Sequence, residues 1–154
     1  MRSLVATLLV AASVLATAVT AATGPYDEAA DAKAQVSAAL AEAGPAKRPV
    51  LVVFGANWCP DCKVLDLAFK RGPSAPLIDK HFKVVKVDVG RFDKNVDVAQ
   101  AYGVPLNKGI PAVVVLSPQG QVLYATQAGE LADARSMGDQ GIYDFFAKVA
   151  AQPR

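Results

Sequence analysis

The chain has 154 residues, with 16 basic and 14 acidic side chains and a formal net charge of +2. This near balance gives no electrostatic basis for binding nucleic acid or an anionic membrane surface, so we expect no nucleic-acid partner. The length suits a single domain with a hydrophobic core. The chain has two cysteines, Cys59 and Cys62.

Residues 1–22 have the layout of a secretory signal peptide. Arg2 precedes an uncharged apolar stretch from Leu4 to Val19, and small residues follow it. A membrane anchor is the alternative, but the stretch is short for a span of roughly 20 residues. We therefore expect cleavage within a few residues of position 22, a secreted or periplasmic location, and one mature domain over residues 23–154.

The mature chain begins with a predicted helix over residues 25–44, because apolar residues recur there at helical spacing and acidic residues occupy its first turn. The run "PVLVVFGA" over residues 49–56 is unbroken, apolar and too short for a typical helix. It therefore predicts a strand that is buried on both faces.

The later elements alternate in the same way. They are a helix from the cysteines to residue 72, a strand over 82–90, a short helix ending near residue 103, a hairpin over 112–126 and a closing helix over 139–152. Early alternation of helix and strand implies parallel pairing, whereas the hairpin must be antiparallel. The order predicts an α/β fold with a mixed sheet and helices on both faces.

The two cysteines lie where the buried strand gives way to the next helix. Pro60 suits the first helical position, which places Cys59 at the helix N-terminus, exposed and in an environment that favours a thiolate. Cys62 lies one turn further and within disulfide reach. A bridge over two residues stabilises a fold very little, so disulfide exchange is a better interpretation than a structural staple.

Two segments resemble the thioredoxin superfamily over roughly residues 45–150. "NWCPDC" is similar to its Trp-Cys-x-x-Cys active-site motif, and "GIPAVVVL" is similar to its cis-proline segment. The resemblance implies a thioredoxin-like three-layer sandwich. It also implies catalytic roles for Cys59 and Cys62 and substrate binding by Ile110 and Pro111.

Neighbouring residues are expected to support this site. Trp58 would shield its rim, Pro60 would start the helix, and Asp61 would oppose the thiolate by its negative charge. Lys86 matches a lysine near the thioredoxin site, although a solvated edge lysine is an equal interpretation. Val53 occupies the position of a buried acidic residue that moves protons in thioredoxins, which puts that proton relay in doubt.

The pattern predicts an exported, disulfide-isomerase-like oxidoreductase that reduces or isomerises protein disulfides. We expect disulfide-bonded or thiol-containing protein substrates, a thiol–disulfide redox partner that is plausibly membrane-bound, and no cofactor. We expect no metal site, because a closed zinc site needs four ligands and His81 falls towards the opposite end of the sheet. The alternative is a copper(I) carrier, with Met137 as a third ligand to the two thiolates.

Overall fold

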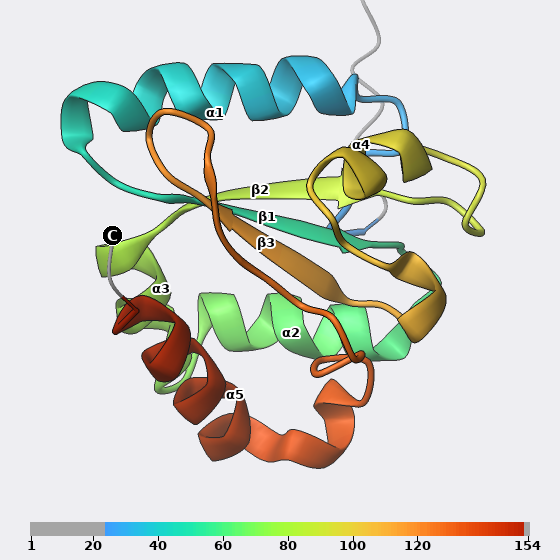
Figure 1. Cartoon of the computed structure of the whole chain (residues 1–154). Coiled ribbons are helices and arrows are strands. Elements are labelled where there is room, and N and C mark those ends of the chain that lie inside the picture. The colour runs from blue at the N-terminus through green and yellow to red at the C-terminus, as the bar shows by residue number, and fades with distance from the viewer. Residues whose placement is uncertain (1–23, 153–154) are drawn as a thin grey trace, which may run out of the picture.

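The computed structural model describes residues 24–152, so the predicted leader lies outside the described residues. The elements are α1 (Ala32–Ala46), β1 (Val50–Gly55), α2 (Pro60–Lys70), α3 (Ser74–His81), β2 (Lys83–Asp88), α4 (Val96–Ala101), the 3₁₀ turn η1 (Leu106–Lys108), β3 (Ala112–Leu116), β4 (Val122–Ala125) and α5 (Ala134–Ala150) (Figure 1). Within this part of the chain, every helix is too short or too polar to cross a membrane.

One four-stranded sheet organises these elements, in the order β2-β1-β3-β4. β1 runs parallel to β2 and antiparallel to β3, and β3 runs antiparallel to β4. All six residues of β1 are buried, as an apolar strand in the middle of a sheet requires. The predicted mixed sheet is therefore confirmed.

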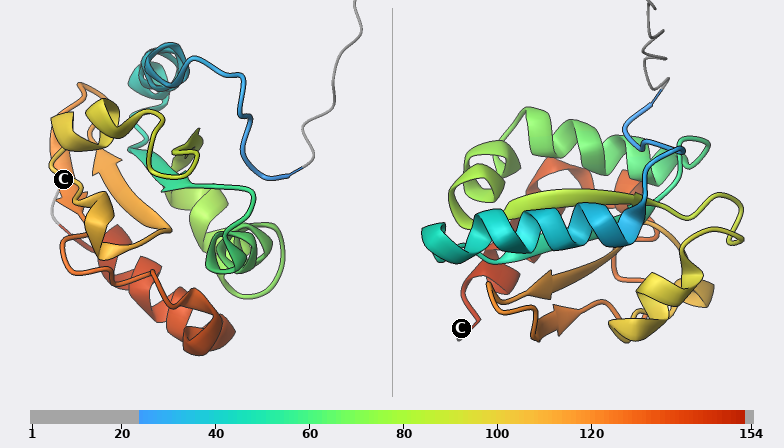
Figure 2. Two further views of the ribbon diagram at one scale, coloured as in Figure 1. Left: turned by 90° about the vertical axis from the view of Figure 1, so that its right-hand side faces the viewer. Right: turned by 90° about the horizontal axis from the view of Figure 1, so that it is seen from above.

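Helices cover both faces of the sheet, which confirms the predicted three-layer arrangement. α1 and α4 lie on one face, and α2, α3 and α5 lie on the other (Figures 1 and 2). Alternate side chains of β1 enter two separate cores: Val52 and Phe54 pack into an α1-side cluster, whereas Leu51 and Val53 pack into an α5-side cluster. Both cysteines belong to the α1-side cluster.

The N-terminal helix begins seven residues later than predicted. Asp31 caps α1, and its side chain accepts a hydrogen bond from the Ala34 N–H at 3.0 Å. Residues 24–31 are non-helical and run along the end of the sheet that carries the cysteines (Figure 2). We call residues 24–31 the N-terminal strap.

Two further helical segments differ from expectation. No element was predicted between residues 72 and 82, where the structure has α3. α5 begins at Ala134 rather than Asp139 and is interrupted at Gly138, whose φ of 64° lies in the left-handed region. Glycine adopts that conformation without a Cβ penalty, so the chain bends there and then resumes its helix.

Candidate active site

The two cysteines lie at one end of the sheet, where β1 passes into α2. Cys59 is the N-cap of α2, and Pro60 is its first helical residue, which needs no N–H partner. Cys59 and Cys62 are joined by a disulfide, with their Cα atoms 5.2 Å apart. The spacing in the sequence therefore produces the predicted pairing.

The Cys59 sulfur lies in a polar environment supplied by the backbone. The Cys62 N–H donates to Cys59 Sγ at 3.1 Å, and the carbonyl oxygen of Ile110 lies 3.6 Å from the same sulfur. An N–H at a helix start favours a negative charge, so this donor also suits the Cys59 thiolate of the reduced protein.

Cys59 is less accessible than expected. The residue is 3% exposed and Cys62 is fully buried, so the prediction of an exposed nucleophile was wrong. Cys59 is covered because the start of α2 packs into the α1-side cluster together with Ile110.

Ile110 and Pro111 lie beside the disulfide, where β3 begins. The peptide bond between them is cis, as the resemblance implied. The antiparallel register pairs Ala112 with Phe54 near the end of β1, which brings the start of β3 to the start of α2. Residues separated by about fifty positions in the sequence thus meet at one site.

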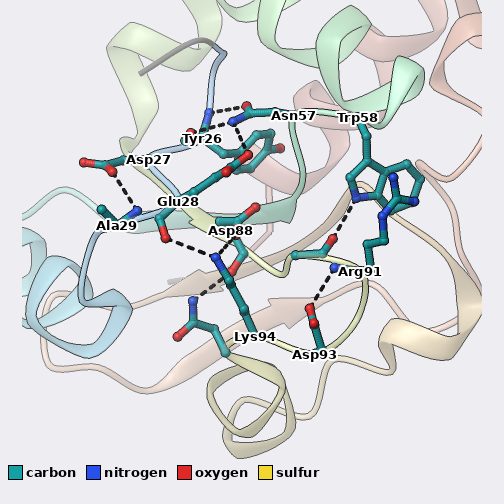
Figure 3. A network of polar contacts seen from close by, with 12 residues as sticks. Tyr26, Asp27, Glu28, Ala29, Asn57, Trp58, Asp88, Arg91, Asp93 and Lys94 are labelled. Atoms are coloured by element: carbon teal, nitrogen blue, oxygen red, sulfur yellow. Dashed lines mark hydrogen bonds and ion pairs between the residues drawn. The ribbon is translucent and has the colours of Figure 1, made fainter. Parts of the chain in front are cut away.

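Trp58 forms an aromatic rim next to the cysteines. Its Nε1–H donates to the Gly90 carbonyl at 2.8 Å, and its ring makes an edge contact with Phe92, at 6.1 Å between centroids. The Arg91 guanidinium lies 5.4 Å from the centroid of the Trp58 ring (Figure 3). Trp58 and Phe92 are both more than 40% exposed, so the rim presents apolar surface to solvent.

Asp61 contacts α5. Its Oδ1 accepts hydrogen bonds from the Arg135 backbone N–H at 2.9 Å and from Arg135 Nε at 3.1 Å. The opposing negative charge expected beside Cys59 is therefore balanced by a cation that sequence reasoning missed. Arg135 is 74 positions away, at the start of α5, and no local pattern pairs it with Asp61.

Lys86 forms an ion pair with Asp66 of α2, which also binds Lys70 at 2.8 Å. Burial lowers the pKa of Lys86. Lys86 pairs in register with Val53, whose side chain is buried in the α5-side cluster. Lys86 therefore lies on an edge strand, but its ammonium group is paired and mostly buried rather than solvated. Its register partner Val53 is apolar and provides no acid at that point of β1.

The N-terminal strap contributes residues that the sequence did not suggest. The Asn57 side chain accepts from the Tyr26 N–H at 3.0 Å and donates to the Tyr26 carbonyl at 2.9 Å and to Glu28 Oε1 at 3.0 Å (Figure 3). Tyr26 is 1% exposed, and burial raises its pKa. Because residues 25–44 read as one helix, nothing local predicted that Tyr26 would enter the site.

The residues considered for metal binding lie apart from the disulfide. Met137 packs against the α5-side cluster, whereas both cysteines belong to the α1-side cluster. His81 ends α3, next to the start of β2, whereas the cysteines lie near its far end. Among residues 24–152, no group of three or more His, Cys, Asp or Glu side chains is arranged to hold a metal ion.

Comparison with known proteins agrees with this geometry. Residues 31–118 match a family model described as thioredoxin-like. The structure is similar to a disulphide isomerase from Xylella fastidiosa Temecula1, with 56% identity, a TM-score of 0.80, and coverage of 84% of this chain and 98% of that chain. A thioredoxin from Thermus thermophilus shares the fold, with 22% identity, a TM-score of 0.52, and coverage of 75% and 83% of the two chains.

A sequence relative points the same way. A thioredoxin from Buchnera aphidicola is 31% identical over 86 residues, which cover 53% of this chain and 67% of the relative. These similarities, together with the bridged Cys59 and Cys62, support thiol–disulfide oxidoreductase activity. The chain belongs to the thioredoxin-like family.

Proposed function

We propose that this protein is an exported thiol–disulfide oxidoreductase that reduces or isomerises disulfides in other proteins. The observation that carries the proposal is the Cys59–Cys62 disulfide at the start of α2, beside Ile110 and Pro111. Export is supported by the signal-peptide pattern of residues 1–22.

In the proposed cycle, the Cys59 thiolate attacks a substrate disulfide and forms a mixed disulfide. The substrate's other sulfur leaves as a thiolate. Cys62 then attacks the Cys59 sulfur, which releases the second substrate sulfur and restores the internal disulfide. The substrate gains two electrons and the protein loses two, so a reduced redox partner must return the protein to the dithiol form.

Substrate recognition is proposed to use the segment and the rim that border Cys59. An extended substrate peptide would lie along Ile110 and bring its disulfide to the covered sulfur by pairing with the backbone. The exposed rings of Trp58 and Phe92 would contact apolar residues near that disulfide. Substrates would therefore be proteins with partly unfolded or flexible segments around their disulfides.

The balanced charge of Asp61 bears on the direction of the reaction. A strong oxidant needs a reduced form that is stabilised far beyond its bridged form. Here the helix start and the Cys62 N–H stabilise the thiolate, and Asp61 with Arg135 adds little net charge. We expect a reduction potential between roughly −180 and −270 mV, the range of disulfide isomerases and thioredoxins.

The central experiment compares two single-cysteine variants of the mature protein. Cys59→Ser should abolish the reduction of insulin disulfides, because the attacking sulfur is lost. Cys62→Ser should retain the first attack and accumulate a mixed disulfide that can be isolated on a non-reducing gel. If both variants reduce insulin at the wild-type rate, the proposed function is wrong.

Further measurements separate the finer parts of the proposal. Recovery of activity from scrambled ribonuclease A would identify isomerase action, and a potential near −120 mV would show a strong oxidant instead. Mass determination of protein secreted by or extracted from its natural host would locate the cleavage site. Tight stoichiometric copper(I) binding that Met137→Ala abolishes would favour the carrier interpretation.

A further inference from the structure

The fully buried Cys62 needs a group that takes its proton before it attacks Cys59. Burial among apolar groups disfavours a thiolate. Val53 provides no acid or base at the position where the resemblance would place one. Another buried polar group near the Cys62 sulfur could take this role.

Tyr26 is the first such group. A Cβ added to Gly55 would overlap the Tyr26 hydroxyl and would lie 2.9 Å from Cys62 Sγ. The Tyr26 hydroxyl and the Cys62 sulfur therefore both lie close to the position that a Cβ of residue 55 would occupy. Asn57 holds the strap in this place through both backbone groups of Tyr26.

Asp88 is the second group, and it lies on the neighbouring strand at the same level. Gly55 and Asp88 are register partners in the parallel pair, and the Val89 N–H donates to the Gly55 carbonyl at 2.9 Å. Side chains of register partners project to the same face of a sheet. The Asp88 side chain therefore lies on the face of the sheet on which a Cβ added at Gly55 would meet Tyr26 and Cys62.

The Asp88 carboxylate is buried and incompletely paired. The residue is 4% exposed, and its Oδ2 has no hydrogen-bond partner among the described residues. Buried polar atoms without a partner are uncommon and call for an explanation. Burial raises the pKa of Asp88, which makes this carboxylate a better proton acceptor than an exposed one.

The charges around Asp88 shift its pKa in both directions. Lys94 Nζ lies 3.9 Å from Oδ2 and also donates to the Glu28 carbonyl at 3.3 Å (Figure 3). The negative charges of Glu28 and Asp93 act in the opposite direction and help to raise the pKa of Asp88. The Asp88 charge also acts on the Tyr26 hydroxyl and, after burial, helps to raise its pKa.

We infer that Asp88 accepts the Cys62 proton through the Tyr26 hydroxyl during resolution of the mixed disulfide; this inference rests on the proposed function. The hydroxyl takes the thiol proton as it passes its own proton to the carboxylate. The S–S bond between Cys59 and the substrate breaks, and the Cys59–Cys62 bond forms. The substrate leaves as a thiolate, and protonated Asp88 can return the proton to it.

The sign of the expected effect separates proton transfer from simple electrostatics. Removing a negative charge near Cys62 favours the Cys62 thiolate and would by itself speed the attack. Removing a proton acceptor slows the attack instead. Asp88→Asn is therefore expected to slow resolution, which a purely electrostatic or structural role of the carboxylate does not predict.

The experiment follows the reduced protein after mixing with one equivalent of 5,5′-dithiobis(2-nitrobenzoic acid). Release of the first thionitrobenzoate reports attack by Cys59. Mass spectrometry of acid-quenched samples then measures the fraction of protein that still carries the adduct on Cys59, before Cys62 resolves it. In Asp88→Asn and Tyr26→Phe at pH 6–7, we expect the adduct to persist at least tenfold longer than in wild type. The difference should shrink towards pH 9, where hydroxide ionises the thiol directly.

The controls make each outcome decisive. Asp27→Asn removes an equal charge next to Tyr26, at an exposed position of the strap, and should leave the adduct lifetime within twofold of wild type. An unchanged lifetime in both Asp88→Asn and Tyr26→Phe overturns the inference, as does equal slowing at every pH. If Asp88→Asn does not fold, Tyr26→Phe alone decides. Failure of wild type to reduce insulin would instead refute the proposed function.

Discussion

The start of α2 and the N-terminal strap meet at the same disulfide, but they are specified in different ways. The start of α2 follows from adjacent residues: a buried strand, Cys59 as cap, and Pro60 as first helical residue. The strap takes its position from Asn57, which lies 31 positions from Tyr26 in the sequence. Neighbouring residues in the sequence thus position Cys59, whereas a long-range clamp between Asn57 and Tyr26 determines the surroundings of Cys62.

This difference implies that the two regions can be altered separately. Changes in the strap should affect Cys62 and leave the first attack by Cys59 intact. Changes beside the start of α2 should alter the redox balance of Cys59 without moving Tyr26. The following experiments test this separation, beginning with the largest expected effect.

Gly55→Ala should disturb the strap most strongly. The added Cβ would overlap the Tyr26 hydroxyl and crowd Cys62 Sγ, so the ring must move or the end of β1 must shift. Overpacking of this kind costs about 1–3 kcal/mol, which urea unfolding can measure. The matched control is Gly44→Ala, where nothing lies within 4 Å of the new Cβ and helix α1 should gain about 0.5–1 kcal/mol.

Asn57→Ala should release the strap without crowding the disulfide. The change removes three hydrogen bonds and leaves both backbone groups of Tyr26 to find other partners, at a cost of about 1–2 kcal/mol. Hydrogen exchange at the Tyr26 amide should accelerate. Asn107→Ala changes an exposed asparagine of η1 and should leave that amide unaffected. Equal exchange in the two variants would show that Asn57 is not the clamp.

Arg135→Ala should act on the start of α2 and spare the strap. Loss of the guanidinium leaves the Asp61 charge less balanced near Cys59, which disfavours the thiolate of the reduced form. The reduction potential should become more negative by about 10–30 mV, where 30 mV corresponds to 1.4 kcal/mol. Lys148→Ala removes an exposed cation near the far end of α5, and a shift of similar size there would argue against a local effect.

The smallest expected effect is a pH dependence of stability that arises from Asp88. Burial raises its pKa in the folded protein, so folding is favoured when the carboxyl is protonated, below its ordinary value of 3.8. That contribution is lost as pH rises through the folded pKa, and a tenfold difference in proton affinity between the folded and unfolded states corresponds to about 1.4 kcal/mol. Relative to Asp88→Asn, wild type should therefore lose unfolding free energy between pH 3 and pH 7. A constant difference would contradict a raised pKa.

Much of the fold was predictable because its information is local. The apolar run of β1, the turn between β3 and β4, and the position of Pro60 each specify an element from a few neighbouring residues. Cys59, Cys62, Ile110 and Pro111 could be placed together because their motifs resemble those of a known family.

The remaining features depend on partners distant in the sequence. The acidic start of "PYDEAADAK" suggested an early helix, yet the side chain of Asp31 caps α1 and the clamp on Tyr26 holds the preceding residues in a non-helical conformation. Arg135 and Asp88 gain their roles only when α5 and β2 approach α2 and β1. The burial of Cys59 likewise follows from the tertiary packing around Ile110.

The left-handed Gly138 divides α5 into two pieces with separate tasks. The first piece brings Arg135 to Asp61, and the second sends Ile142 and Phe146 into the α5-side cluster. A side chain at residue 138 would strain this bend and favour one continuous rod. The bend therefore gives the two pieces different directions, so that one helix supplies both the cation beside Asp61 and the apolar residues that cover the sheet.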